Sequence, residues 1–285
     1  MAETSLLDLF KMVSLRYGSV YANVTTTSVG TTTTFVSTSL IGRDDLGGAQ
    51  RAVIGGVDYQ LTDFDSATGT GTFQPAAGAA IANGASVTIL PQPRHTMLWA
   101  INSAIDAMGD SWRAAKSVDD YFSLSATVQS YTLPANCIDV SELLVNTRMG
   151  IGSLKRYAPE QDFDVIAQGA GLPKLLQMRN SFGGYIGYTS GTRLLYYALP
   201  NKLSADADTL GIGELDEREA VHFVELMATA FLIEKDVQYN PVTQSSRAQK
   251  SKDQTLKAEA EQIRANRKRN QQPARVRSSP RRAQI

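Results

Sequence analysis

Basic side chains gathered toward one end of the chain are the residues best suited to bind a charged partner. From residue 247 onward, twelve Lys and Arg side chains stand against three acidic ones, a net charge of +9. Such a segment can contact nucleic-acid phosphates, an anionic membrane surface or an acidic protein surface. We predict that the binding residues are Arg247, Lys250, Lys252, Lys257, Arg264, Arg267, Lys268, Arg269, Arg275, Arg277, Arg281 and Arg282.

The basic segment lacks certain kinds of side chain, and this limits the classes of partner that it can bind. No aromatic residue occurs from Asn240 to Ile285, so nucleic-acid bases have no stacking platform and sequence-specific readout is not expected. A membrane-binding helix needs Trp, Phe or Leu along an amphipathic face, and the segment lacks one, so we expect no membrane partner. What remains is electrostatic docking, either onto nucleic acid without specificity or onto a protein.

The rest of the chain carries the opposite charge. The 285 residues contain 28 basic and 28 acidic side chains, and this balance conceals a body with a net charge of −9. Because the body is acidic and the segment basic, contact between neighbouring copies of the chain is also available. The composition, with 42% apolar and 20% charged residues, is that of a folded chain with one or two sizeable cores.

Residue patterns typical of enzymes are missing from the sequence. The two histidines, His95 and His222, are far apart, and His222 lies in an apolar helix, where a core or interface role is favoured over catalysis. Cys137, the only cysteine, follows a proline turn without a protease-like context and cannot form an internal disulfide. No GxSxG or Walker-type motif occurs. We therefore expect no enzymatic activity and no cofactor.

Two acidic pairs, Asp44-Asp45 and Asp206-x-Asp208, are the candidates for a metal site. Paired carboxylates suit Mg²⁺ or Ca²⁺, but neither loop supplies the closing bidentate Glu of a calcium loop. Aspartates beside Ser and Gly commonly cap turns, which is the interpretation we favour. We expect no bound metal.

Three amphipathic segments and one Thr-rich stretch must position these residues. Apolar residues at helical spacing predict helices at 5–17, 96–108 and 216–236, with Ser5 and Thr96 as N-caps of the first two. Between the first two helices, short β-like runs alternate with Gly-Gly and Asn-Gly turns. This pattern predicts a small antiparallel barrel or sandwich inserted into a helical protein.

The remaining segments are less regular. Residues 194–199 favour a strand, residues 137–145 favour a strand or a short helix, and the acidic stretch 159–168 favours a helix. Residues 244–270 can form a helix, but Leu256 and Ile263 are their only large apolar side chains, so we expect no face buried on their own subunit. Residues 271–285 show no periodicity and, alone, should be disordered.

Together these patterns predict an α+β protein. A helical bundle with additional strands should comprise 1–20 and 94–244, and a small antiparallel β-barrel or sandwich should occupy 21–93. A basic, extended C-terminal arm, 245–285, should dock on a partner because it cannot fold on its own surface.

Two strings resemble head-to-tail adaptor (connector) proteins of tailed bacteriophages. The first is SATVQSYTLPANCIDVSELLV, and the second is RLLYYALPNKLSADADTLGIGELDEREAVHFVELMATAFLIEKD. In that family a YTLP-type element precedes a strand, and a Tyr-Tyr strand leads through a Leu-Ser-Ala-Asp loop into a long helix. The β-rich insert also resembles modules of phage neck and tail proteins.

The resemblance implies a structural virion protein of the head-tail junction. Such adaptors form a ring, usually of twelve subunits, between the portal protein and tail or nozzle proteins, and DNA passes through the ring without sequence-specific contact. Their C-terminal arms lock onto the portal, which here corresponds to 245–285. The resemblance also implies that the protein is made in the host cytoplasm, which agrees with a first segment, MAETSLLDLF, that lacks the basic start of a signal peptide.

Two alternatives stay open at this point. One is another neck or tail component, such as a tail-tube or terminator protein. The other is a DNA-binding protein whose basic segment neutralises phosphates without sequence specificity.

Overall fold

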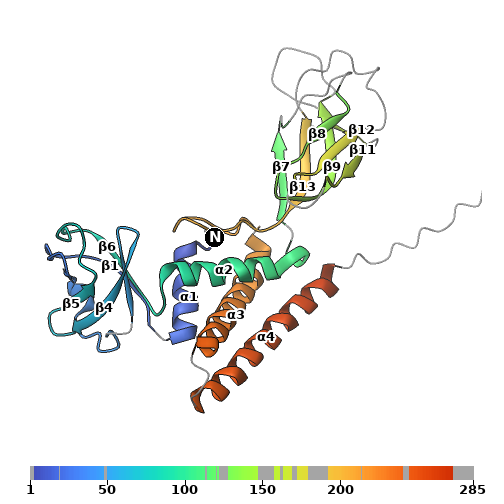
Figure 1. Cartoon of the computed structure of the whole chain (residues 1–285). Helices are drawn as coiled ribbons and strands as arrows, with labels where there is room; N and C mark the ends of the chain where they lie inside the picture. Colours follow the sequence, from blue (N-terminus) through green and yellow to red (C-terminus); the bar gives the residue numbers. More distant parts are fainter. Residues whose placement is uncertain are drawn as a thin grey trace, which may run out of the picture. The chain divides into compact units, whose positions relative to one another are not determined.

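The computed structural model of the chain has an α+β fold, which confirms the predicted class (Figure 1). It combines long helices with antiparallel sheets, and its contacts divide the chain into two compact units. The first unit is 1–111 with 202–210 and 217–285, and the second is 112–201 with 211–216. The described residues are 3–18, 20–47, 50–112, 114–119, 121, 128–146, 157–160, 163–168, 172–178, 192–212, 214–239 and 244–271.

The helices belong almost entirely to the first unit. Their bounds are α1 Leu6–Gly18, α2 Arg94–Met108, α3 Glu214–Tyr239 and α4 Gln244–Gln271, with short 3-10 turns η1 Thr38–Leu40 and η2 Gly109–Ser111. The predicted N-cap of α1 is confirmed: the Asp8 N–H donates to Ser5 Oγ at 3.3 Å, and the Ser5 N–H and hydroxyl donate to the Asp8 carboxylate. The apolar stripes of α1, α2 and α3 are buried, as their spacing predicted.

Helix α2 begins differently from the prediction. Thr96 is buried inside the helix, and Pro93 occupies the N-cap position, where its side chain makes no capping hydrogen bond. Instead, the Arg94 N–H donates to Asp58 Oδ2 at 2.9 Å, from a strand far away in sequence. Capping by a residue outside the helix has no local sequence pattern, so the sequence could not reveal it. Asp58 thus links the β-rich region to the helices.

Replacing this cap should weaken the first unit. We expect Asp58→Ala to lower the free energy of unfolding by about 1–2 kcal/mol, because a backbone donor and the positive end of α2 both lose their carboxylate. Asp63→Ala is the matched control, since the Asp63 carboxylate bonds only the next N–H on the same strand. Chemical denaturation of both variants measures the difference, and equal stabilities would exclude the capping role.

Residues 22–90 form a six-stranded antiparallel sheet. Its strands are β1 Ala22–Thr25, β2 Thr34–Val36, β3 Arg51–Ile54, β4 Val57–Asp65, β5 Thr70–Gln74 and β6 Ser86–Leu90. The order is β1-β6-β3-β4-β5-β2, and a bridge between Ser28 and Val36 brings the chain after β1 against the opposite edge strand. The Thr27 N–H also donates to the Val36 carbonyl at 2.9 Å. The sheet therefore curls into a half-barrel.

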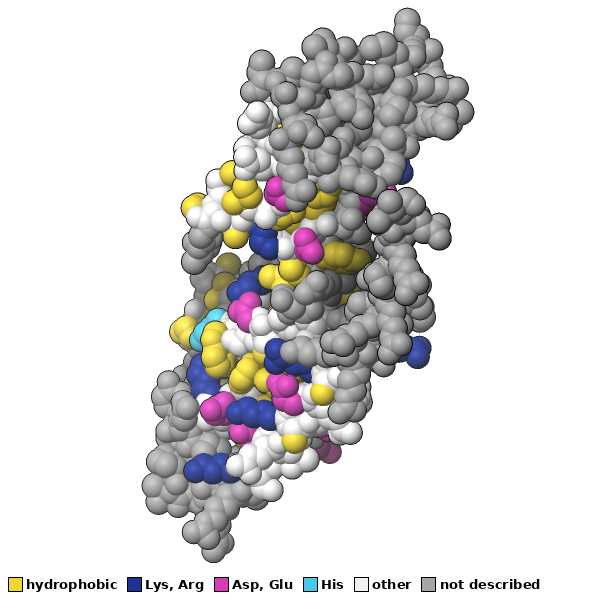
Figure 2. Space-filling view, turned by 90° about the vertical axis from the view of Figure 1, so that its right-hand side faces the viewer, with side chains coloured by type: hydrophobic (Ala, Val, Ile, Leu, Met, Phe, Trp, Pro, Cys, Tyr) yellow, Lys and Arg dark blue, Asp and Glu magenta, His cyan; other side chains and the backbone are white. Residues whose placement is uncertain are grey.

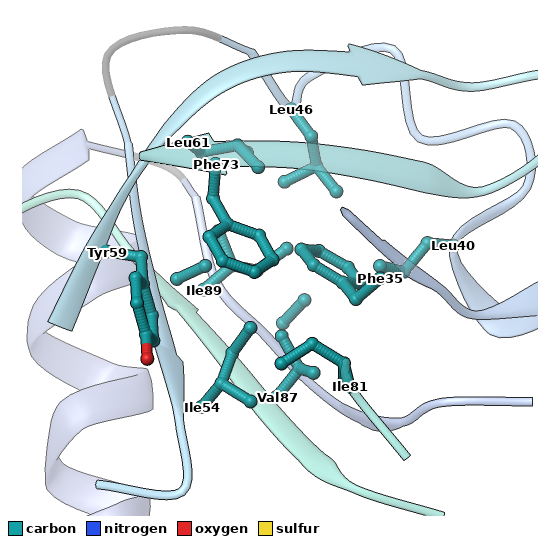
Figure 3. Packing of buried hydrophobic residues seen from close by; sticks show 12 residues of the cluster. Phe35, Leu40, Leu46, Ile54, Tyr59, Leu61, Phe73, Ile81, Val87 and Ile89 are labelled. Carbon is teal, nitrogen blue, oxygen red and sulfur yellow. The ribbon is translucent and has the colours of Figure 1, made fainter. Parts of the chain in front are cut away.

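The concave side of this sheet encloses its own hydrophobic core (Figure 3). Phe73 is at its centre, with ring centroids 4.7 Å from Tyr59 and 6.4 Å from Phe35. Gly71 makes room for this cluster, because a Cβ there would lie 2.4 Å from the Phe35 ring. The members of the cluster are Ala22, Phe35, Leu40, Leu46, Ala52, Ile54, Tyr59, Leu61, Phe73, Ile81, Val87 and Ile89.

The second unit holds two further sheets. Their strands are β7 Ala114–Asp119, β8 Ser130–Thr132, β9 Cys137–Asn146, β10 Tyr157–Glu160, β11 Phe163–Ile166, β12 Leu175–Met178 and β13 Thr192–Ala198. The orders are β10-β9-β13-β7 and β11-β12-β8, both antiparallel. The predicted strand at 194–199 is confirmed as β13, which alternates buried and partly buried residues between β9 and β7.

The helix predicted at 159–168 is wrong. Phe163–Ile166 instead forms β11, which pairs with β12 from Phe163 opposite Met178 to Ile166 opposite Leu175. Phe163 and Val165 are more buried than the residues that alternate with them. This two-residue repeat of burial is that of a strand, and it outweighs the acidic composition that favoured a helix. Residues 185–191, YIGYTSG, whose composition also favours a strand, lie outside the described residues.

Candidate functional site

The basic residues predicted to bind a partner divide into four groups. Lys250 lies exposed on α4, whereas Lys252, Lys257, Arg264 and Arg267 contact other residues of the first unit; Lys252 is exposed, but its Nζ donates to the Arg16 carbonyl of α1 at 3.3 Å. Three more belong to α4, although their side chains are not described: Arg247, Lys268 and Arg269. The last four, Arg275, Arg277, Arg281 and Arg282, lie outside the described residues.

The expectation that this helix buries no face on its own subunit is wrong. Leu256 and Ala260 are buried, and Arg267 is only 8% exposed. The expectation considered only large apolar residues. It therefore missed Ala260, which is small, and Arg267, whose aliphatic part can be buried although the side chain is charged. The signal was the three- and four-residue spacing of Asp253, Leu256, Ala260 and Arg267, which places all four on one face of the helix.

Lys257 holds the middle of α4 by ion pairs. Its Nζ lies 2.9 Å from Glu234 of α3 and 3.2 Å from Asp253 one turn earlier. Partial burial lowers the pKa of Lys257, but the hydrogen bonds to Glu234 and Asp253 outweigh it and raise the pKa above its ordinary value. This lysine is therefore firmly charged and engaged within its own chain.

Arg267 anchors the far end of α4. Its Nε donates to the Ser111 carbonyl at 2.8 Å, and its guanidinium lies 3.5 Å from Glu219 of α3. Arg264, one turn earlier, donates to the Ser111 hydroxyl at 3.4 Å. Arg267 thus binds a backbone carbonyl just beyond the end of α2, where carbonyls lack intrahelical partners, and both arginines also pair with acids, Arg264 with Glu261 at 3.2 Å.

His222 lies on α3 and is partly exposed. Its Nδ1 is 3.3 Å from Glu225 and its Nε2 is 3.7 Å from Glu259 of α4. The interface role favoured by its place in an apolar helix agrees with this geometry. His95, at the start of α2, is exposed, with its Nδ1 3.9 Å from Asp58.

Three of the four aspartates in the acidic pairs make contacts within the fold. Asp208 accepts the N–H groups of Ser204 and Ala205, which lowers its pKa below the ordinary value, and Asp206 pairs with Arg94 at 2.7 Å. Asp45 pairs with Arg43 at 2.6 Å. The preferred interpretation of Asp208 as a turn-capping residue is confirmed. No group of three or more potential metal ligands occurs among the residues that the structure describes.

Cys137 is buried at the start of β9. Burial raises the pKa of its thiol, an effect that the nearby Lys174 ammonium partly opposes. Because the thiolate is the nucleophilic form, this environment favours an unreactive cysteine.

The described surface carries charges of both signs. On the face drawn in Figure 2, Lys and Arg side chains alternate with Asp and Glu and form no patch of a single sign. Within the described ranges, no helix has the length and apolar character needed to cross a bilayer.

The family of the chain follows from its match to a family model. The model described as SU10 adaptor protein matches residues 93–277, from the start of α2 past the end of α4. This chain belongs to the SU10 adaptor protein family. It is thus a structural adaptor of a phage and a virion component that associates with other phage proteins. No curated protein matches it.

The family match covers only part of the chain. It covers the second unit, α2, α3 and α4, but it leaves out α1 and the six-stranded sheet. The basic residues up to Arg277 fall within the matched range, so α4 and the residues just after it are part of what defines the family.

Proposed function

We propose that this adaptor forms a ring between the portal and the tail and gives DNA a passage through the neck of the virion. The family match over 93–277 is the observation that carries the proposal. The charge division supports it: residues 1–267, which precede the last six cations of the chain, carry 22 basic and 28 acidic side chains, and this net charge of −6 repels the phosphate backbone, so DNA can pass without sticking. We expect twelve subunits and direct contact with tail or nozzle proteins.

The C-terminal basic residues are the proposed portal contact. Lys257, Arg264 and Arg267 are held by partners in the first unit, so they are poor candidates for a direct contact. The residues beyond Arg267 carry six cations and no acid: Lys268, Arg269, Arg275, Arg277, Arg281 and Arg282. We therefore assign the arm that docks on the portal to 268–285.

Electron microscopy of the purified adaptor, alone and with the portal of the same phage, tests the proposal. We expect closed rings that stack coaxially on portal rings. An adaptor that stays monomeric in both samples would overturn the proposal.

The specific alternative is DNA binding through the +9 segment, and salt dependence separates it from the portal role. If six cations neutralised phosphates, log K for duplex DNA would fall with log salt at a slope of about −5. Tight DNA binding with that slope, together with no affinity for portal, would favour the alternative.

A further inference from the structure

Two exposed apolar surfaces of the first unit carry opposite charges. One surrounds Trp99 on α2, and the other surrounds Ile41 after η1; these side chains are 50% and 52% exposed. A Trp side chain left half-exposed in a folded unit is a typical centre of a protein interface.

The Trp99 surface is rigid and positively charged. Its indole ring packs against Phe231 of α3, with centroids 6.2 Å apart, and the Lys235 Nζ lies 5.4 Å from the ring centroid. Lys235 also donates to Thr96 at 3.5 Å, and no carboxylate of the described residues pairs with it. His95, one turn before Trp99 on the same helix, is 79% exposed. Trp99 therefore stands beside an ammonium group that forms no ion pair within the described part of the chain.

The Ile41 surface is its electrostatic complement. Ile41 lies over the turn between β4 and β5, where the Gly42 N–H donates to the Ser66 carbonyl at 2.8 Å. Asp44, three residues on, is exposed, and its carboxylate has no hydrogen bond or ion pair with the described residues. Asp65, at the start of the same turn, is also exposed, and bonds to Thr68 and Ala67 lower its pKa, which keeps it negatively charged. Arg43 adds no net charge, because it pairs with Asp45.

We propose that the Trp99 surface of one copy binds the Ile41 surface of the next, with Lys235 facing Asp44. This inference rests on the proposed ring. Two different, complementary surfaces on one chain make a head-to-tail contact. Such a contact closes into a ring when the rotation that relates neighbouring copies is a whole fraction of a full turn. Each surface pairs an apolar centre with a charge that forms no ion pair with the described residues, and the contact supplies an opposite charge to each.

A charge swap in the full-length chain tests this pairing. Mass photometry of wild type should show rings, and Trp99→Ala should raise the concentration at half-assembly by about 30-fold, the usual effect of losing an aromatic hot spot. Lys235→Glu and Asp44→Lys should each weaken assembly by about tenfold, and the double variant should recover most of the loss.

Matched controls keep the outcomes separable. Lys11→Glu, an exposed reversal on α1, should assemble like wild type, and circular dichroism must show that every variant is folded. If wild type forms rings and Trp99→Ala forms them equally well, or if the double variant gains nothing over the single ones, this inference fails and the ring proposal stands. If wild type forms no ring with or without portal, both fail.

Discussion

Removing residues 272–285 is expected to weaken binding of the adaptor to the portal by about 30-fold to 1,000-fold. The deletion takes away four arginines and no acid: Arg275, Arg277, Arg281 and Arg282. Contacts between exposed opposite charges contribute roughly 0.5–1 kcal/mol each, and each 1.4 kcal/mol corresponds to a factor of ten in affinity.

The boundary of this deletion follows from the packing of α4. The helix ends at Gln271, and Arg267 holds its last turns against Ser111 and Glu219. A truncation at 245 would remove Leu256 and Ala260 as well, and would expose the helices that they cover. Loss of binding would then report a damaged fold. The shorter deletion leaves that packing in place.

The measurement is co-elution and biolayer interferometry with the portal at low and physiological salt. Replacing the four arginines by lysine should preserve most of the affinity, and replacing them by glutamine should reproduce the deletion, because charge is the expected cause. An unchanged affinity after deletion would remove 272–285 from the portal contact, whereas equal losses with lysine and glutamine would indicate that guanidinium geometry matters more than charge.

The sequence predicted best where one local pattern decides the structure. The apolar stripes of α1, α2 and α3 and the glycine turns of the β-rich region are such patterns, and the helices and strands formed there. The capping interpretation of Asp208 was equally local, since its partners lie within four residues.

Predictions failed where a distant partner decides. Asp58 caps α2 from 36 residues away, and β11 owes its form to pairing with β12. On α4, contacts from Glu234, Glu219 and Ser111 turn a polar helix into a packed one. Because these contacts are polar, the sequence of α4 shows no helical repeat of large apolar residues. The basic residues of α4 therefore looked free to bind a partner, although several of them contact their own chain.

Phe73→Ala is expected to unfold the β-rich region, 21–93, while the helices stay folded. Phe73 is fully buried between Tyr59 and Phe35, and truncating such a ring costs about 3–5 kcal/mol. That is a large part of the 5–15 kcal/mol that stabilises a typical domain. The cluster around Phe73 draws its buried members only from residues 22–89, so the loss should stay within this region if 21–93 is an inserted domain.

Hydrogen exchange followed by mass spectrometry measures where the protection is lost. In Phe73→Ala, amides of β3 to β6 should exchange at least a hundredfold faster, while those of α3 keep their wild-type protection. Val57→Ala is the control, because Val57 is an exposed apolar residue of the same sheet and its truncation leaves no cavity. If α3 loses protection together with the strands, the β-rich region and the helices form one cooperative unit, and the insertion of an independent domain at 21–93 is wrong.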